Sequence, residues 1–566
     1  MKVLDQLSGI KPFDTDPRTR TYLRPVCIVM TKGDVQNAEC LLKNVPNQIQ
    51  LADSVETVTM RNTEGSEHAA ILLDLGCEIH GSVRILTQNC DPHPAQVKIR
   101  MGESVSEAMN DVGVKGATTD HANRDFMLNL QILSGTDTNE SGFRFIWLEL
   151  LGDKALLNLR AVTGVLIVRD IEYVGSFESD DPLVDQIYRT AAYTAHLNMQ
   201  EYMWDGIKRD RLVWIGDMHP EVMTICSVFG DNEVVPRSLD FARDVSDLNK
   251  ETRFKWMNGI PSYSLWWLMC QYDYYMQNGN LDYLAEQKDY LVRLLELLCG
   301  QVDEDGVEKM EAWRFLDWPT NADPEAKHAG LQGLLCMGLD AGAKLADVLG
   351  ESASAERCRQ LTAKMKEHHF TCQAKQAVAL TVLAGINDAV ETDRDYISKG
   401  GAHGYSTFYS YYTLAARAMA GKTAEALQDM REYYGAMLKL GATTFWEDFS
   451  LDWVESAGGF DHVSGIDEIP AEGKKDIHGD YGAYCYVGLR HSLCHGWSSG
   501  PVTFLTRHVL GVKILEPGCK KLEIKPNLCG LGFIRGSFPT PYGKVSIYAD
   551  KNGVKIDAPD GVEIVR

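Results

Sequence analysis

Short alternating or apolar runs dominate the first ~175 residues of the chain. They occupy residues 70–75, 81–86, 95–100, 143–150 and 164–169, and Gly, Asn and Asp separate them. Because the side chains of a half-buried strand alternate between two faces, runs of this length and spacing are typical of β-strands. The pattern predicts an N-terminal β-sandwich domain over residues 1–178.

Near residue 180 the pattern changes to helical spacing. Residues 179–182 read Ser-Asp-Asp-Pro, a helix-start signal, and small or apolar residues then recur every four positions from Leu183 to Ala195. About twelve helical segments are predicted, beginning near residues 182, 219, 235, 262, 281, 325, 354, 372, 405, 423, 480 and 499. Alternating short and long loops suit an (α/α)6 toroid, but the pattern alone does not separate this fold from an irregular helical bundle.

Strand-like runs return at residues 511–515, 521–525, 543–548 and 553–557. A β unit this short has little core of its own, so we expect a small sandwich docked against the helices. The chain is thus predicted to be a multidomain protein. A central all-α (α/α)6 toroid over residues 179–509 is flanked by β-sandwich domains over residues 1–178 and 510–566.

The net charge of the chain limits the classes of molecule that we expect it to bind. Of 566 residues, 56 are Lys or Arg and 79 are Asp or Glu, which gives a formal net charge of −23. A surface this acidic repels phosphate backbones and anionic lipid, so we expect no nucleic acid and no membrane as a partner, whereas a neutral sugar is not repelled. No apolar run approaches the roughly 18 residues that span a bilayer. The sequence does not decide whether the protein forms a homo-oligomer.

The N-terminus and the 14 cysteines bear on location. The first residues contain one Lys, an early Asp and no apolar segment, so we expect no signal peptide and a cytoplasmic protein, or a periplasmic or secreted one if a leader was removed. The cysteines are scattered without a C-x-x-C pair, and the apolar contexts of Cys226 and Cys270 predict buried free thiols. Zinc-site spacing is absent.

Residues 205–217 carry the densest candidate chemistry. The segment reads Asp-Gly-Ile-Lys-Arg-Asp-Arg-Leu-Val-Trp-Ile-Gly-Asp and contains the carboxylates of Asp205, Asp210 and Asp217. Its two glycines argue against a helix, so we expect a loop at one mouth of the helical domain. Clustered carboxylates raise one another's pKa, which suits one of them to donate a proton. A salt-bridged surface loop is the alternative.

Other candidates lie further along the chain. Glu447 follows a tryptophan in a short apolar segment, where a carboxylate pKa rises, although a helix-capping role is the alternative. Sugar rings stack on aromatic faces, and packing in the core is the alternative for each tryptophan. The remaining candidates for contact with a sugar are Trp313, Asp317, Trp318, Trp446, His495 and Trp497. His462 is a weaker candidate. No P-loop, dinucleotide fingerprint, nucleophile elbow or H-E-x-x-H motif occurs.

Together these segments resemble the α-L-rhamnosidases of glycoside hydrolase family 78. Residues 205–217 match the family's D-x-x-x-x-E-R-L-G-W-x-G-D segment, and residues 442–447 match its A-T-T-x-W-E segment. The resemblance implies β-sandwich domains around an (α/α)6 barrel. It also implies an inverting hydrolase that releases terminal α-L-rhamnose, or a related sugar, by general acid/base catalysis. Neither a metal nor an organic cofactor is expected.

The resemblance also assigns roles to residues. Asp210 aligns with the general acid and Glu447 with the general base. The carbohydrate substrate would be bound through its hydroxyls by Asp205, Arg209, Asp217 and His495, and around its ring by Trp214, Trp313, Asp317, Trp318, Trp446 and Trp497. The family usually has Glu at position 210 and Gly at position 213, where this chain has Asp and Val. Asp is shorter than Glu by one methylene, which sets the Asp210 carboxyl further back. Glu221 is therefore the alternative candidate for the general acid, here called the reserve acid.

Other functions fit the same fold. The (α/α)6 toroid also hosts glucosidases, uronic-acid lyases and sugar phosphorylases, and the fold does not choose among them. A non-catalytic sugar-binding protein is a further alternative, because the acid position departs from the family. We expect the carboxylates near Asp210 and Glu447 to favour a neutral deoxy-sugar over a uronic acid.

Overall fold

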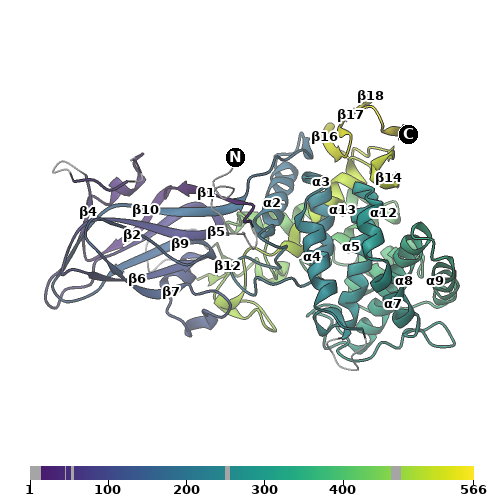
Figure 1. The fold of residues 1–566 in the computed structure, drawn as a ribbon, viewed down its shortest axis with the longest axis horizontal. Coiled ribbons are helices and arrows are strands. Elements are labelled where there is room, and N and C mark those ends of the chain that lie inside the picture. The colour runs from purple at the N-terminus through teal and green to yellow at the C-terminus, as the bar shows by residue number, and fades with distance from the viewer. Residues whose placement is uncertain (1–14, 45, 47, 52–55, 249–254, 460–472) are drawn as a thin grey trace, which may run out of the picture.

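Three parts of the chain lie against one another in the computed structural model, which describes residues 15–44, 46, 48–51, 56–248, 255–459 and 473–566. The N-terminal strands form one half of an elongated molecule and the helices form the other. The C-terminal strands sit on the helices, away from the N-terminal strands (Figure 1). Of the helices that the structure describes, none is both long and apolar enough to cross a bilayer.

Ten N-terminal strands share one hydrogen-bonded network with its own hydrophobic core. Strand β10 alternates buried and half-buried side chains over much of its length, whereas β5 is buried along most of its length. Val83, Ile85 and Val97 are fully buried in this core. The main path of pairing runs β3-β4-β10-β5-β9-β6-β7, with β1, β2 and β8 attached to β10 and β5. The strands are β1 (Arg18–Leu23), β2 (Cys27–Lys32), β3 (Asp34–Gln36), β4 (Val58–Asn62), β5 (Ala70–Asp91), β6 (Ala95–Gly102), β7 (Asp125–Leu130), β8 (Ser134–Asp137), β9 (Ser141–Leu150) and β10 (Ala155–Arg169), and the short helix α1 (Val105–Met109) follows β6.

The helical part begins where the sequence predicts. Asp181 caps the first long helix by accepting hydrogen bonds from the backbone N–H groups of Leu183 and Val184. The helices are α2 (Pro182–Asn198), α3 (Met218–Val228), α4 (Val234–Asp244), α5 (Pro261–Asn278), α6 (Leu281–Glu286), α7 (Lys288–Cys299), α8 (Pro324–Val348), α9 (Ser352–Met365), α10 (Lys375–Leu383), α11 (Ala389–Thr392), α12 (Ser410–Met419), α13 (Thr423–Lys439) and α14 (Gly500–Phe504).

Six of these helices pack in a closed sequence. Helix α3 packs on α5, α5 on α8, α8 on α10, α10 on α12, α12 on α14, and α14 returns to α3. Helices α2, α7, α9 and α13 contact members of this ring. The first turns of α3 and α5 lie beside the candidate site described below, so the ring fixes where its loops begin.

Two helix predictions differ from the structure. The helix predicted to begin near residue 480 is absent from the described residues 480–495, because Gly482 and Tyr484 have φ angles of 98° and 59° that an α-helix does not accept. Helix α7 was not predicted separately, since the break between α6 and α7 falls at Gln287, which keeps helical dihedral angles.

The C-terminal strands share a hydrophobic core with the helices. That core contains Val222 of α3 as well as Val545 and Ile547 near the C-terminus. One sheet has the order β11-β16-β17-β18, from β11 (Ser176–Ser179), β16 (Phe533–Thr540), β17 (Gly543–Asp550) and β18 (Gly553–Asp557). The other has the order β14-β15-β19, from β14 (Val512–Glu516), β15 (Lys521–Ile524) and β19 (Glu563–Val565), and β12 (Ala457–Gly458) pairs with β13 (Lys475–Asp476). The boundary expected near residue 178 thus falls inside β11, which pairs with β16.

Candidate active site

One small cavity gathers most of the predicted site residues. Its volume is ≈ 80 Å³, and it lies beside the first turns of α3 and α5. Its walls are Asp205, Arg209, Asp210, Trp214, Asp217, Ile260, Tyr263, Trp313, Phe315, Trp318, Glu447, Cys485, Tyr486, His495 and Trp497.

The loop 205–217 is held in an irregular shape that presents its carboxylates. The backbone N–H of Asp205 donates to the carbonyl of Leu212 over 3.1 Å, and the Leu212 N–H donates to Asp205 Oδ1 over 2.9 Å. Asp210 and Arg211 both have left-handed backbones, with φ angles of 58° and 53°. Two consecutive residues of this kind cost conformational energy, and such strain is concentrated at functional sites.

Arg209 links the two proposed catalytic carboxylates. Its Nη1 donates to Asp210 Oδ1 over 3.0 Å, and its Nη2 donates to Glu447 Oε1. Burial alone would lower the pKa of Arg209, but the charges of Glu447 and Asp210 outweigh burial and raise it. One permanently charged guanidinium therefore holds both carboxylates in the same cavity.

Glu447 is fixed through its side chain and its backbone. The backbone N–H of Ser492 donates to Glu447 Oε2 over 3.1 Å, and Trp497 Nε1 donates to the Glu447 carbonyl over 3.0 Å. Burial raises the pKa of Glu447, while Arg209 and the Ser492 N–H act in the opposite direction.

Asp205, Asp217 and His495 form a second group in the cavity. Burial raises the pKa of Asp205 and of Asp217 well above the ordinary value, and the neighbouring carboxylates add to this effect. Burial lowers the pKa of His495 well below its ordinary value, so its ring is neutral. One donor atom from each of the three lies within 4.8 Å of the others, an arrangement that suits sugar hydroxyls and that could also hold a cation.

The aromatic candidates divide into positioning and wall residues. Trp214 Nε1 donates to Asp210 Oδ2 over 3.1 Å, so this indole holds the acid carboxyl. Trp313 is exposed at the mouth, and Trp318 stacks on Tyr484 with ring centroids 6.2 Å apart. Trp497 stacks on a buried phenylalanine and fixes the Glu447 backbone. The exposed Trp313 ring is the one most available to a ligand.

Three predicted residues lie outside the cavity walls. Asp317 accepts hydrogen bonds from the N–H and hydroxyl of Thr320, and so stabilises a turn. Trp446 is almost fully buried against Phe449. Glu221, the reserve acid, is fully buried, and neither of its oxygens has a hydrogen-bond partner among the described residues. His462 lies outside the described residues.

Besides Ile260 and Cys485 of the cavity wall, four residues that meet the site were not predicted. The Tyr263 hydroxyl donates to Asp217 Oδ1 over 2.9 Å, and Phe315 and Tyr486 line the cavity. His121 Nε2, from the N-terminal strand region, lies 3.2 Å from Asp210 Oδ1. Phe315 sits within the aromatic 313–318 segment, which is a sequence signal, but the other three are placed by long-range packing that no local pattern shows.

Residues 172–379 match the family model for the bacterial alpha-L-rhamnosidase 6 hairpin glycosidase domain. This region is similar to the six-hairpin glycosidase domain of bacterial α-L-rhamnosidases. The match confirms the predicted resemblance and includes loop 205–217 and α3 to α8. A comparison with curated protein sequences gave no match.

Solved structures share the fold of the six-hairpin domain and its surroundings. A family 78 rhamnosidase of Bacillus sp. GL1 is 21% identical, with a TM-score of 0.73 over 93% of this chain and 55% of that one. A rhamnosidase from Klebsiella oxytoca with rhamnose bound is 19% identical, with a TM-score of 0.65 over 86% of this chain and 95% of that one. An α-L-rhamnosidase of Streptomyces avermitilis complexed with L-rhamnose is 16% identical, with a TM-score of 0.66 over 88% and 48%. This chain thus spans about half the length of the Bacillus and Streptomyces proteins.

Proposed function

We propose that the protein is an inverting glycoside hydrolase that releases terminal α-L-rhamnose, or a closely related sugar, from glycosides or oligosaccharides. The observation that carries the proposal is the pairing of Asp210 and Glu447 through the two terminal nitrogens of Arg209. Both carboxylates of a glycosidase must flank one glycosidic bond. The match to the rhamnosidase domain and the likeness to rhamnosidases solved with rhamnose support the sugar.

The proposed reaction divides its two proton transfers between these carboxyls. Asp210 protonates the glycosidic oxygen, while ionised Glu447 removes a proton from a water molecule on the opposite face of the sugar. Since one guanidinium contacts both groups, the two carboxyls lie close together in one cavity. The strained backbone at Asp210 compensates for its short side chain by aiming the carboxyl into the cavity.

We expect the second group, which consists of Asp205, Asp217 and His495, to bind the neutral hydroxyls of a sugar. Asp205 and Asp217, with raised pKa values, and the neutral ring of His495 supply both donors and acceptors. A uronic acid would add a negative charge beside Glu447, with Arg209 already engaged by two carboxylates. The cavity therefore favours a neutral sugar, and Trp313 and Trp318 are expected to contact its apolar face.

We further propose that the closed ring of helices is the inner layer of an (α/α)6 toroid. The support is the return of α14 to α3 after five successive packing contacts. Helices α2, α9 and α13 then belong to the outer layer. This arrangement explains why loops from distant parts of the chain, near residues 210, 315 and 447, meet at one cavity.

The proposed acid/base reaction requires neither a metal nor a cofactor, because both proton transfers use carboxyl groups. Asp205, Asp217 and His495 are nevertheless close enough to hold a cation. Dialysis against a chelator should leave kcat unchanged. A loss of activity that Ca²⁺ or Zn²⁺ restores would instead assign these three residues to a metal.

The decisive test is a panel of aryl glycosides: α-L-rhamnoside, α-L-arabinoside, β-D-glucoside and β-D-glucuronide. We expect turnover of the rhamnoside, release of the inverted anomer by NMR, and a loss of about 10³-fold in kcat for Glu447→Gln. An unsaturated product would indicate a lyase, and dependence on phosphate would indicate a phosphorylase. Binding of rhamnosides without turnover would indicate a sugar-binding protein.

A further inference from the structure

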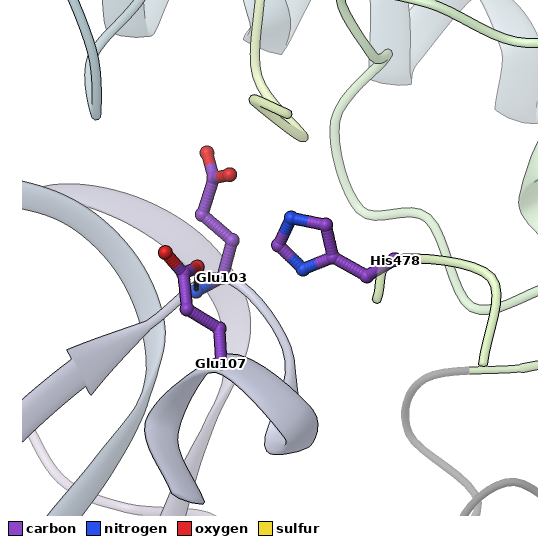
Figure 2. A group of neighbouring side chains, drawn as sticks. All are labelled: Glu103, Glu107 and His478. Atoms are coloured by element: carbon purple, nitrogen blue, oxygen red, sulfur yellow. Dashed lines mark hydrogen bonds between the residues drawn. The ribbon is translucent and has the colours of Figure 1, made fainter. Parts of the chain in front are cut away.

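A buried group of charged residues lies outside the cavity, where the N-terminal strands meet the helical domain. Glu103 directly follows β6, Glu107 belongs to α1, and the ring of His478 approaches both from a loop of the helical part (Figure 2). All three side chains are buried, and one donor atom from each lies within 4.8 Å of the others. A group of this kind needs a positive charge nearby.

The chain itself supplies that positive charge. Lys208 Nζ lies 3.0 Å from Glu103 Oε2 and 3.2 Å from Glu107 Oε1, and Arg124 Nε lies 3.3 Å from Glu107 Oε1. Both nitrogens of His478 are already engaged, Nδ1 with the Ser104 hydroxyl at 2.7 Å and Nε2 with a backbone carbonyl at 2.9 Å. The cluster is thus a completed ion network and not a metal site.

This network reaches Glu447 through a single residue. The Ser492 hydroxyl donates to Glu103 Oε1 over 3.2 Å, while the Ser492 backbone N–H donates to Glu447 Oε2 over 3.1 Å. The next N–H, of Leu493, donates to Glu103 Oε2 over 2.7 Å. Glu447 also donates to the same residue, because its backbone N–H donates to the Ser492 carbonyl over 3.0 Å. Glu103 therefore fixes the segment that holds one oxygen of Glu447.

The network also reaches the other oxygen of Glu447. Lys208 is anchored by Glu103, Glu107 and the Leu489 carbonyl, the last at 3.1 Å. The residue after it is Arg209, which contacts Glu447 Oε1 and Asp210. The side chain of Glu103 therefore lies behind both supports of the proposed base.

We propose that Glu103, paired with Lys208, is a positioning residue for the general base Glu447, so that the N-terminal strand domain is part of the catalytic apparatus. The inference rests on the proposed function. Glu103 does not line the cavity and touches no substrate; it acts by holding Ser492 and loop 205–212 in place. Burial raises the pKa of Glu103 to about 7 despite the opposing charge of Lys208, as expected for a carboxylate kept dry for a positional role.

The test uses Glu103→Gln, which keeps the shape of the side chain and removes its charge. We expect kcat for an aryl α-L-rhamnoside to fall about 10- to 100-fold with KM changed less than about 2-fold, because a misplaced base slows the chemical step and not binding. The matched control is Asp74→Asn, which breaks another ion pair of the same strand domain, with Arg144 at 2.8 Å. That variant should lose stability and keep kcat.

A double-mutant cycle separates positioning from general destabilisation. Ser492→Ala removes the hydroxyl that bonds Glu103 and also the backbone of Cys494, so it should lower kcat in the wild type and have a smaller effect beside Glu103→Gln. Asp74→Asn should combine additively with Glu103→Gln. Full additivity of Ser492→Ala with Glu103→Gln, or a wild-type kcat for Glu103→Gln, would overturn the proposal.

A crystal structure of full-length Glu103→Gln gives a readout that does not depend on activity. The expected change is a lengthened contact between Ser492 N and Glu447 Oε2, with the Glu447 side chain turned from its wild-type position. An unmoved Glu447 would refute the positioning role even if the protein hydrolyses rhamnosides. A moved Glu447 in a protein that cleaves none of the glycosides would refute the proposed function and leave the positioning role intact.

Discussion

Helices α3 and α5 each connect two hollows of very different character. Their first turns lie beside the ≈ 80 Å³ cavity of the candidate site, where Asp217 and Tyr263 line the wall. Their other ends lie beside two adjoining hollows of ≈ 470 and ≈ 290 Å³, which share Asp273 and Arg507, and the first of these borders β14. Both hollows are larger than the cavity of the candidate site, so size alone would favour them over it.

The state of the carboxylates reverses that conclusion. Burial would raise the pKa of Asp273, but Arg507 and His219 overcome it and hold the pKa well below the usual range. In the small cavity, burial raises the pKa of Asp205 and Asp217, and the charges around them do not restore the ordinary value. The single carboxylate of Asp273 is matched by Arg507 and serves the fold, whereas the four carboxyl groups in the wall of the small cavity outnumber its one guanidinium, which indicates chemistry.

The strongest test of this contrast is Asp210→Asn. If Asp210 is the acid, kcat should fall by about 10³- to 10⁴-fold on a rhamnoside with a poor leaving group, since the proton donor is lost. The loss should be far smaller for an activated leaving group such as dinitrophenolate, which needs little protonation. A leaving-group series measured for kcat and kcat/KM would show this difference.

Glu221→Gln is the matched control. Burial raises the pKa of Glu221 well above the ordinary value, and the amide of Gln keeps the shape of this buried side chain. We expect kcat within a few-fold of the wild type. A leaving-group dependence in Glu221→Gln, together with wild-type turnover by Asp210→Asn, would transfer the acid role to Glu221.

Arg209→Gln tests the link between the two carboxylates and should cost about 100-fold in kcat, because both lose their shared support. Arg209 lowers the pKa of Glu447, so its removal raises that pKa further. Since Glu447 must be ionised to act as base, the acidic limb of the kcat/KM profile should move to higher pH. Arg211→Gln, whose guanidinium donates to the backbone carbonyls of Glu140 and His121 and lies over the Trp204 ring, should leave that limb in place. An unmoved limb in Arg209→Gln would contradict the assignment of Glu447 as base.

Local sequence patterns predicted those parts of the molecule that are locally determined. The cap at Asp181 and the start of α2 follow from neighbouring residues, and so does the grouping of Asp205, Asp210 and Asp217 in one loop. The helix predicted near residue 480 was wrong because left-handed residues, such as Gly482, interrupt an otherwise helical spacing. A Cβ at Gly482 would lie 2.1 Å from the Tyr486 carbonyl oxygen, a constraint that only the folded chain reveals.

The site residues also divide into those that a local sequence motif predicts and those that only the folded chain brings to the site. Glu447 and Trp214 could be predicted because each belongs to a short motif, whereas Glu103, His121 and Tyr263 reach the site from elements that lie far apart in the sequence. Asp317 shows the opposite error. It stands between two aromatic residues in the sequence, yet its oxygens face Thr320 and other buried hydrogen-bond donors.

Trp313→Ala should have a moderate effect confined to binding. Its ring is 46% exposed at the mouth of the cavity, so removing it costs a sugar contact worth about 0.5–1.5 kcal/mol and little stability. KM for the rhamnoside should rise up to about 10-fold with kcat unchanged, and Trp313→Phe should recover most of the loss. An unchanged KM would remove Trp313 from the binding wall.

The far hollow should give the smallest effect on turnover. Asp273→Asn leaves Arg507 without its carboxylate, 3.3 Å away in the wild type, and should lower the free energy of unfolding by about 1–3 kcal/mol. The figure stays below that of a fully buried pair because Arg507 is 35% exposed. The pKa of Asp273 is depressed in the folded state, so its stabilisation is present above the ordinary aspartate pKa and is lost as the pH falls through the folded value. Asp273→Asn should therefore flatten the acid side of the stability curve, measured by urea unfolding, while kcat stays at the wild-type value. A large loss of kcat with unchanged stability would mean that the far hollow also takes part in function. The contrast between Asp273 and the carboxyls of the small cavity would then fail.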